Sequence, residues 1–331
     1  PPRLLFSEGP LMSLLHADVV IVGGAGFIGR ALAATLISRN KSVRIITRER
    51  ERARALWPLP RIEIVEANPN EEASLYEALE NADAVINLVG VLHSKTGRPW
   101  GPDFDAAHVK LPARIARCMN RRKISRLIHI SALGASDQAP SMYLRSKAAG
   151  EAALRANQSL ELTILRPSVV FGAEDQFMNL FGRMQKVLPI IPLATPHARF
   201  QPIAVTDLAV AIANCLDHPA TAGKHYECVG PEVLTLYELV HWAGVYAECP
   251  RPIIPLPDGA AWVQAWIMEN LPGKPLMSRD NLASASVPNV ANGPMAAELG
   301  IPSPQSIHSV VPTYLGKETP RARLADRRAK T

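Results

Sequence analysis

Tyr143 and Lys147 stand four residues apart in the stretch YLRSK, and Ser131 ends the apolar run LIHIS twelve residues before the tyrosine. On a helix, residues four apart share one face. A phenol with a pKa of about 10 is a poor acid at neutral pH, but a lysine ammonium and an oxidised nicotinamide ring beside it would favour the phenolate. A serine at the end of a strand could hold a substrate oxygen while hydride moves. We therefore predict Tyr143, Lys147 and Ser131 as catalytic residues, with Lys147 also bonded to the nicotinamide ribose.

A YxxxK spacing by itself also arises by chance on exposed helices, so the elements around these residues must decide its meaning. From Asp18 onward, short apolar segments alternate with helical periods. Short apolar strands without polar alternation favour a parallel sheet covered on both faces. We predict an α/β fold with a doubly wound parallel sheet. The pattern predicts strands at 19–22, 42–47, 61–67, 82–90, 126–131 and 162–167, and helices at 29–39, 71–80, 105–120 and 143–157.

The turn after the first predicted strand carries three glycines in the stretch VVIVGGAGFIGR, namely Gly23, Gly26 and Gly29. In a doubly wound fold this turn lies at the carboxyl edge of the sheet, where the next helix begins. Glycines let the backbone approach a pyrophosphate, whose charge is met by free N–H groups at the helix start. The spacing is not the common GxGxxG, and the alternative is a turn that only packs helix on strand. Its position between the first strand and a helix favours a dinucleotide site.

The end of the second predicted strand, IITRERERAR, bears on which dinucleotide binds. Thr47 stands where an acidic residue would accept the ribose hydroxyls of NAD, and Arg48 follows it. Arg30, directly after the third glycine, can reach the same place. Arginine offers a planar fork of donors that suits a 2′-phosphate. We therefore favour NADP(H), with NAD(H) as the alternative, because Glu49 is near and the arginines could be merely solvated.

These motifs together resemble the short-chain dehydrogenase/reductases of the extended or atypical kind. The resemblance is carried by GGAGFIG (23–29), NLVG (87–90), Ser131, the Tyr143 and Lys147 pair, RPSVVFG (166–172) and QPIAVTDLAVAI (201–212). It implies a Rossmann fold, with the pyrophosphate on the glycine loop, Asn68 near the adenine and Pro167 to Val169 at the nicotinamide end. The cofactor-binding residues that it implies are Gly23, Gly26, Phe27, Ile28, Gly29, Arg30, Asn68, Val89, Gly90, Lys147, Pro167, Ser168 and Val169.

A narrower resemblance is to the dehydrogenase-like accessory subunit of mitochondrial respiratory complex I and its bacterial relatives. It rests on FDAAHVKLPARIA, ISALGAS, YLRSKAAGEAALR, LRPSVVFGAEDQFMN and CVGPEVLTLYELV. In the mitochondrial subunit the nucleotide is understood to be held structurally, and some relatives are linked to quinone metabolism. One position departs from the wider family, since His108 stands where many members have an asparagine that supports a proton-relay water. A relay role and a merely partnered histidine are both open, and we favour the second.

The 331 residues, 47% of them hydrophobic and 20% charged, are typical of a globular chain with one large and one smaller domain. We expect a smaller, mostly C-terminal helical substrate domain, because the sequence becomes loop-rich after Gly172 and its prolines cluster beyond Gly230. The expected division is 1–17 as an uninformative N-terminal segment, 18–170 and 203–230 as the dinucleotide-binding domain, 171–202 and 231–315 as the substrate domain, and 316–331 as a basic, disordered tail.

The net charge of +6 is uneven, since residues 316–331 hold six basic and two acidic side chains. The rest of the sequence has no basic stripe with interleaved aromatics, so we expect no nucleic acid partner. Four dispersed cysteines without a CxxC favour a reducing compartment and no metal site. Trp262 and Trp266 share a helix face, which fits a core, a partner surface or, less often, a membrane interface. We expect a cytoplasmic protein, with peripheral contact to an inner membrane or a respiratory complex (on the mitochondrial matrix side in a eukaryote) as the alternative.

Three functions are open on the sequence alone. The first is NADP(H)-dependent hydride transfer on an unidentified small carbonyl or quinone-related substrate, with Tyr143 as the acid–base group. The second is a nucleotide-holding subunit of a respiratory membrane complex without turnover. The third is a nucleotide-sugar epimerase or dehydratase, which needs a basic clamp for the substrate's diphosphate. Arg183, Lys186 and Arg199 are candidates for that clamp, but they do not make a convincing set.

Overall fold

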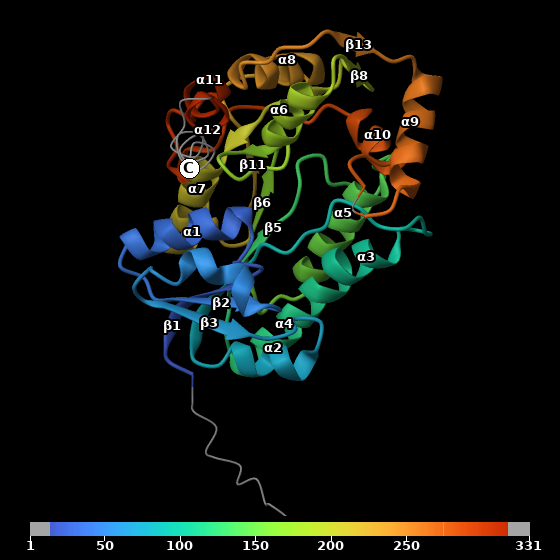
Figure 1. The fold of residues 1–331 in the computed structure, drawn as a ribbon. Coiled ribbons are helices and arrows are strands. Elements are labelled where there is room, and N and C mark those ends of the chain that lie inside the picture. Colours follow the sequence, from blue (N-terminus) through green and yellow to red (C-terminus); the bar gives the residue numbers. More distant parts are fainter. Residues whose placement is uncertain (1–13, 274, 317–331) are drawn as a thin grey trace, which may run out of the picture.

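A seven-stranded parallel sheet lies at the centre of the computed structural model, which describes residues 14–273 and 275–316 (Figure 1). Its strand order is β11-β6-β5-β4-β1-β2-β3, and every pairing is parallel. The strand order reverses between β1 and β4, and ligands of such sheets bind at the carboxyl edge of that point. The strands are β1 (Ala17–Val22), β2 (Val43–Thr47), β3 (Ile62–Glu66), β4 (Ala82–Asn87), β5 (Arg126–Ile130), β6 (Glu161–Pro167) and β11 (His225–Cys228).

Helices cover both faces of this sheet because its strands are apolar on both sides. Val19 and Ile21 of β1 pack in the core beneath α1 and α7, whereas Val20 and Val22 pack in the core beneath α2, α4 and α5. The predicted doubly wound α/β fold is confirmed. The helices are α1 (Phe27–Ser38) and α7 (Val205–Asp217) on one face, and α2 (Glu72–Ala78), α4 (Leu111–Arg122) and α5 (Met142–Arg155) on the other.

Helices and short strand pairs after β6 build a smaller unit with its own apolar core around Phe171, Leu239 and Val311. In Figure 1, α6, α8 and α9 lie at the top of the molecule, away from α2 and α4 at the bottom. The helices of this unit are α6 (Met178–Val187), α8 (Leu236–Tyr246), α9 (Asp258–Asn270), α10 (Arg279–Ala285), α11 (Ile307–Val310) and α12 (Pro312–Leu315). Its strands pair as β7 (Val170–Phe171) with β10 (Ile203–Ala204), β8 (Ile191–Leu193) with β13 (Ile253–Pro255), and β9 (Arg199–Phe200) with β12 (Leu234–Thr235).

The described residues also include three 3-10 helical segments, namely η1 (Arg50–Leu56), η3 (Pro219–Thr221) and η4 (Ala297–Leu299). Leu299 of η4 is buried in the core that α1 and α7 share, so residues from the range 231–315 also pack on the nucleotide-binding part. Within the described ranges, none of the helices combines the length and the apolar content needed to cross a lipid bilayer. The segments 1–13 and 317–331, which include most of the predicted N-terminal segment and basic tail, lie outside the described residues.

The helix predicted at 105–120 is not one regular α-helix. A short α3 (Pro102–Phe104) leads into a π-helical turn, η2 (Asp105–Lys110), before α4 begins. Pro112 has no N–H, so it cannot donate to the carbonyl oxygen of His108, four residues before it, as an α-helix requires. That carbonyl faces α5 instead, where a Cβ on Gly150 would stand 2.0 Å from its oxygen. The proline and the absence of a side chain at 150 together account for the wide turn.

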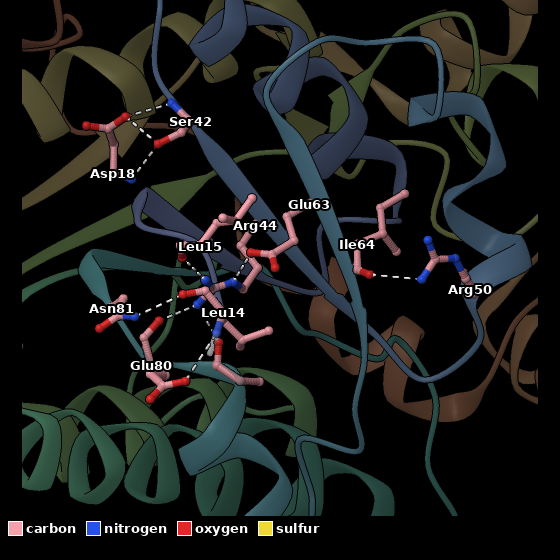
Figure 2. Close-up of polar contacts among 11 residues, drawn as sticks. Leu14, Leu15, Asp18, Ser42, Arg44, Arg50, Glu63, Ile64, Glu80 and Asn81 are labelled. Carbon is pink, nitrogen blue, oxygen red and sulfur yellow. Dashed lines mark hydrogen bonds and ion pairs between the residues drawn. The ribbon is translucent and has the colours of Figure 1, made fainter. Parts of the chain in front are cut away.

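Arg44 is a fully buried arginine in the middle of β2. Its Nε donates to Glu63 Oε2 at 2.6 Å, and its terminal nitrogens donate to the carbonyl oxygens of Leu15, Ala78 and Glu80 (Figure 2). A buried charge is tolerated when it is paired and its N–H groups are satisfied. Arg44 meets both conditions, and it fastens the residues before β1 to the connection between α2 and β4.

Candidate nucleotide and catalytic site

The glycine loop between β1 and α1 forms a cradle that side chains would fill. Gly23 has φ +83°, and a Cβ on it would stand 3.0 Å from Val89 Cγ2. Gly26 precedes the first residue of α1, Phe27, and no side chain caps this helix start. A Cβ on Gly29 would stand 2.3 Å from the oxygen of Gly24, so α1 packs directly on the turn. Bare backbone and uncapped N–H groups at a helix start fit the pyrophosphate of a dinucleotide.

The side chains at the end of β2 that could contact the ribose differ in whether they already have partners within the protein. Thr47 is buried and its Oγ1 donates to the carbonyl oxygen of Glu49 at 3.0 Å. The carboxylate of Glu49 makes two hydrogen bonds with Arg52, at 2.7 and 2.8 Å. The side chain of Arg48 is exposed and makes no hydrogen bond or ion pair with the described residues. The loop therefore presents a free cation and an acid that is already paired.

Two other predicted contacts on this side have partners within the protein. Arg30 donates from Nη1 to the oxygen of Ala25 at 2.9 Å and forms an ion pair with Glu174 in the loop after β7. Asn68 follows β3, where its Nδ2 donates to Glu71 Oε1 at 2.8 Å and its Oδ1 accepts from the N–H of Asn70. The structure thus places Arg30 beside the glycine loop and Asn68 in the turn that leads into α2.

Lys147 and Ser131 meet at the carboxyl end of β5. Lys147 is 4% exposed, and its Nζ donates at 3.2 Å to the oxygen of Ile130, the residue before Ser131. A Cβ on Gly90, in the loop after β4, would stand 3.2 Å from the same Nζ. Ser131 is 3% exposed, and its Oγ has no hydrogen-bond partner among the described residues. The predicted Ser131, Lys147 and Gly90 are therefore brought together, and the buried Ser131 hydroxyl is without a hydrogen-bond partner among the described residues.

Tyr143 lies one turn before Lys147 on α5 and is half-buried. Its ring packs edge-on against Phe104 and His108, with centroid distances of 6.0 and 5.5 Å. Burial raises the pKa of Tyr143 to about 12 and lowers the pKa of Lys147 to about 8, against a smaller opposing effect of Glu151. Without a cofactor the phenol of Tyr143 therefore keeps its proton at neutral pH.

His108 of the π turn uses both ring nitrogens. Its Nε2 accepts from the N–H of Val91 at 3.0 Å, and its Nδ1 lies 2.8 Å from Ser146 Oγ. The Ser146 hydroxyl donates its single hydrogen to the oxygen of Tyr143, so Nδ1 of the histidine carries the hydrogen in that pair. Burial, followed by the charge of Lys147, lowers the pKa of His108 to about 2. The favoured interpretation, a neutral and partnered histidine, agrees with this geometry.

A role for a second buried histidine, His129 of β5, was not predicted from the sequence. Asn87 Oδ1 accepts from the N–H of Val89 at 3.1 Å, which turns the amide nitrogen of Asn87 toward His129 Nδ1, 3.1 Å away. Burial, followed by the charge of Lys147, lowers the pKa of His129 to about 3. The sequence feature that could have predicted this pair is a histidine and an asparagine inside the apolar strands LIHIS and ADAVIN. We call Asn87, His108, His129, Ser131 and Lys147 the inner polar cluster.

The start of α5 is fixed from the other half of the chain. Ser141 Oγ accepts from the N–H of Leu144 at 3.2 Å. Asp280 of α10 accepts from the N–H groups of Met142 and Tyr143 at 2.6 and 3.0 Å. A carboxylate at a helix N-terminus also complements the helix dipole. Asp280 therefore helps to hold the backbone of Tyr143, although it lies 137 positions away.

The residues predicted at the nicotinamide end are the last residue of β6, Pro167, and the two that follow it, at the same edge of the sheet. The oxygen of Pro167 accepts from the N–H of Leu133 at 3.0 Å, and the oxygen of Val169 accepts from the N–H of Ile203 at 3.0 Å. Ser168 donates from Oγ to Asn289 Oδ1 at 2.5 Å. Backbone bonds thus anchor this segment next to the loop after Ser131.

One group of three metal-ligand side chains occurs among the described residues. Ligand atoms of His16, Asp18 and Asp83 lie within 4.8 Å of one another on the surface. Asp18 already accepts from the backbone and hydroxyl of Ser42, as Figure 2 shows. The group lies at the amino ends of β1 and β4, opposite to the inner polar cluster, and we assign no metal to it.

Residues 23–219 match the family of proteins described as NAD(P)H-binding. The chain belongs to the NAD(P)H-binding family. The match starts at the first glycine of the loop and extends past the end of α7, so it includes the inner polar cluster. The predicted dinucleotide-binding fold of the epimerase- and dehydratase-like kind is confirmed.

Individual members of this wider group align over most of their length. A mitochondrial protein of Mus musculus, NADH dehydrogenase [ubiquinone] 1 alpha subcomplex subunit 9, is 29% identical over 318 residues, covering 92% of this chain and 81% of that protein. Ceramide reductase of Caulobacter vibrioides is 28% identical over 255 residues, covering 75% and 78%. The crystal structure of DesIV, a dTDP-glucose 4,6-dehydratase of Streptomyces venezuelae with NAD bound, has a TM-score of 0.63 at 20% identity, covering 81% and 95%. At that identity the structural likeness shows the fold alone.

In the second half of this NAD(P)H-binding protein, α9 turns large apolar side chains outward. Its buried positions are Ala261 and Ala265, whereas Trp262 and Trp266 are 50% and 47% exposed. The Arg279 guanidinium lies 5.4 Å from the centre of the Trp262 ring. The three candidates for a diphosphate clamp are exposed, and they lie on α6 and β9: Arg183, Lys186 and Arg199.

Proposed function

We propose that this protein is an oxidoreductase that moves hydride between NADP(H) and a carbonyl or quinone-related substrate. The observation that carries the proposal is the position of Lys147. It is buried between Gly90 and the end of β5, one helical turn after Tyr143, and it donates to the oxygen of Ile130, the residue before Ser131, whose hydroxyl has no partner among the described residues. A buried lysine with a lowered pKa, placed at the carboxyl edge of the sheet, is a candidate for a functional residue.

In the reducing direction, Ser131, Tyr143 and Lys147 each have a separate role. When bound, NADPH would supply hydride to the substrate's carbonyl carbon. Ser131 donates a hydrogen bond to the carbonyl oxygen and holds it beside the phenol. Tyr143 gives its proton to that oxygen, so the carbonyl becomes an alcohol and the tyrosine becomes a phenolate. Lys147 lowers the free energy of that phenolate through its charge until solvent returns the proton.

The preference for NADP(H) rests on the loop after β2. Arg48 is exposed and free of partners within the described residues, whereas the nearby acid, Glu49, is occupied by Arg52. A guanidinium without an internal partner favours a 2′-phosphate over a ribose hydroxyl. Arg30, paired with Glu174, contributes less to this preference in our proposal.

The test follows bound nucleotide by fluorescence after the protein is purified. We expect added NADPH to exchange within seconds, compatible with turnover of about 10 per second. We further expect a panel of long-chain ketones and quinones to oxidise bound NADPH. Nucleotide that stays bound for hours, with none of the panel consuming it, would overturn the proposal.

A second function is favoured by one specific observation. The mouse relative, whose name places it in NADH dehydrogenase [ubiquinone], aligns with 92% of this chain, and α9 of this chain has outward tryptophans that a partner surface could cover. We propose as the alternative that the protein holds its nucleotide structurally and attaches, through α9, to a membrane or to a membrane complex on its inner side. In that case nucleotide release takes hours, and the protein sediments with membranes. Trp262→Ser combined with Trp266→Ser would release it.

A further inference from the structure

His129 lies in β5, and Ser131 directly follows this strand, where its N–H continues the pairing with β6 by donating to the oxygen of Leu165. They are two positions apart, and side chains two apart on a strand point to one side. Both are buried, at 1% and 3% exposure. Each has one polar atom without a partner among the described residues, Nε2 of His129 and Oγ of Ser131.

The hydrogen-bond network decides what His129 Nε2 offers. Val89 donates to Asn87 Oδ1, so the amide nitrogen of Asn87 donates to His129 Nδ1. Nδ1 is therefore an acceptor, and in a neutral ring the hydrogen must lie on Nε2. His129 thus presents a buried N–H donor, and such donors in folded proteins are nearly always paired.

The other members of the inner polar cluster cannot accept this hydrogen. The Asn87 oxygen is taken by Val89, and the His108 nitrogens are taken by Val91 and Ser146. Lys147, whose charge acts on His129, has donors only. The acceptor on this face is Ser131 Oγ, and it does not bond directly to Nε2, because both atoms are without a hydrogen-bond partner among the described residues. One water that makes two hydrogen bonds of about 2.8 Å can join atoms up to about 5.6 Å apart.

We propose that one buried water joins His129 Nε2 to Ser131 Oγ, and that His129 is thereby a positioning residue for Ser131. The water accepts from His129 and from Lys147 and donates to the serine oxygen, which gives it three polar partners. Because Ser131 then accepts on its inner side, its own hydrogen points outward to the substrate oxygen. This inference rests on the proposed function for the role of Ser131, but the water itself does not depend on it.

The first test needs no substrate. In protein labelled with 15N-histidine, which holds nine histidines, the signal lost in His129→Phe identifies His129. We expect the hydrogen on Nε2, no titration between pH 5 and 9, and, in a crystal structure at high resolution, an ordered water within hydrogen-bond distance of both atoms. A hydrogen on Nδ1, or side chains in direct contact with no water between them, would overturn the proposal.

The second test measures the consequence for Ser131. We expect His129→Phe to lower single-turnover NADPH oxidation about 10- to 100-fold, less than removal of a donor outright, while the Kd for NADPH stays within about twofold. Ser131→Ala combined with His129→Phe should be no slower than Ser131→Ala alone, because both act through one hydroxyl. His225→Phe, at an exposed histidine of β11, is the matched control, and His129→Gln, which keeps a donor and an acceptor, should recover most of the rate. Additive effects in the double variant would contradict the positioning role, whereas full activity in Ser131→Ala would contradict the proposed function and leave the NMR result standing.

Discussion

Gly150 of α5 lies against the carbonyl oxygen of His108, so closely that a Cβ at position 150 would stand 2.0 Å from that oxygen. The contact joins the helix that carries Tyr143 and Lys147 to the π turn that carries His108. Since His108 in turn accepts from Val91, the contact also sets the distance between α5 and the loop that contains Gly90. The site therefore depends on one helix-to-helix approach that only glycine permits.

Gly150→Ala should destabilise the protein by about 2 kcal/mol or more, because the methyl group meets backbone that cannot move away cheaply. Urea unfolding followed by circular dichroism gives the free energy of unfolding. Gly259→Ala is the matched control, since Gly259 also lies in a helix but has no atom within 4 Å of an added Cβ. That substitution should stabilise by about 0.5–1 kcal/mol through helix propensity. Equal effects of the two substitutions would contradict the tight packing at 150.

Tyr143→Phe should lower NADPH oxidation by about 10²- to 10⁴-fold, because it removes the proton that the substrate oxygen receives. Nucleotide affinity should be unchanged, since the phenol is not expected to contribute to ground-state binding of the nucleotide. Stopped-flow fluorescence measures both quantities on one sample. Tyr237→Phe, at an exposed tyrosine of α8, serves as the control. Unaltered turnover in Tyr143→Phe would remove the residue from the mechanism.

Lys147→Met should stabilise the nucleotide-free protein at pH 7 by about 1–3 kcal/mol, because methionine avoids burying a charge. Burial lowers the folded pKa of Lys147 to about 8 from 10.5. Below pH 8 the lysine is protonated in both the folded and the unfolded protein, so the folded protein bears the full free-energy cost of burying its charge. Between pH 8 and 10.5 the unfolded chain holds a proton that the native protein lacks, so wild-type stability rises with pH.

Urea unfolding at several pH values checks this expectation. The difference between Lys147→Met and wild type should shrink as the pH approaches 10. Lys224→Met, at an exposed lysine paired with Glu298, should show little pH-dependent difference from wild type. A variant at 147 that is less stable at every pH would show that the lysine is a structural anchor.

Arg44→Ala should destabilise the protein by about 3–5 kcal/mol, since it leaves Glu63 and three carbonyl oxygens without their partner in a buried place. Arg50→Ala provides the comparison. Its guanidinium is exposed and donates only to the oxygen of Ile64 at 3.3 Å (Figure 2), so the effect should stay within about 0.5 kcal/mol. Chemical unfolding distinguishes the two outcomes, and a small effect at 44 would mean that water replaces the arginine.

Arg48→Ala should raise the Kd for NADPH by about 10- to 100-fold, the range expected for one hydrogen bond to a charged group. The Kd for NADH should change by less than about threefold. Fluorescence titration with each nucleotide gives both numbers, and Arg54→Ala, further along η1, is the control. Equal losses for the two nucleotides would assign Arg48 to the pyrophosphate or the adenine.

The features that could be predicted best from the sequence are those that depend on residues close together along the chain. The glycine loop, the apolar strands and the Tyr143–Lys147 spacing are local patterns, and the sheet, the helix α5 and the meeting of Lys147 with Ser131 followed from them. The π-helical turn could not be predicted from the local sequence, because it depends both on Pro112 and on Gly150, which belongs to another helix. Asp280 was missed for the same reason, since nothing near it in sequence shows that it caps α5.

The place of β11 at the edge of the sheet has a consequence for how the protein is made. β6 ends at Pro167, but its outer neighbour starts at His225, after α6 and α7 have been synthesised. Until that neighbour has emerged from the ribosome, the edge of β6 offers unpaired N–H and C=O groups to any other chain. A nascent chain that ends between β6 and β11 already contains Ser131, Tyr143 and Lys147, but its sheet has an uncovered edge at β6. A chaperone that covers this edge during translation should therefore reduce aggregation of the nascent chain.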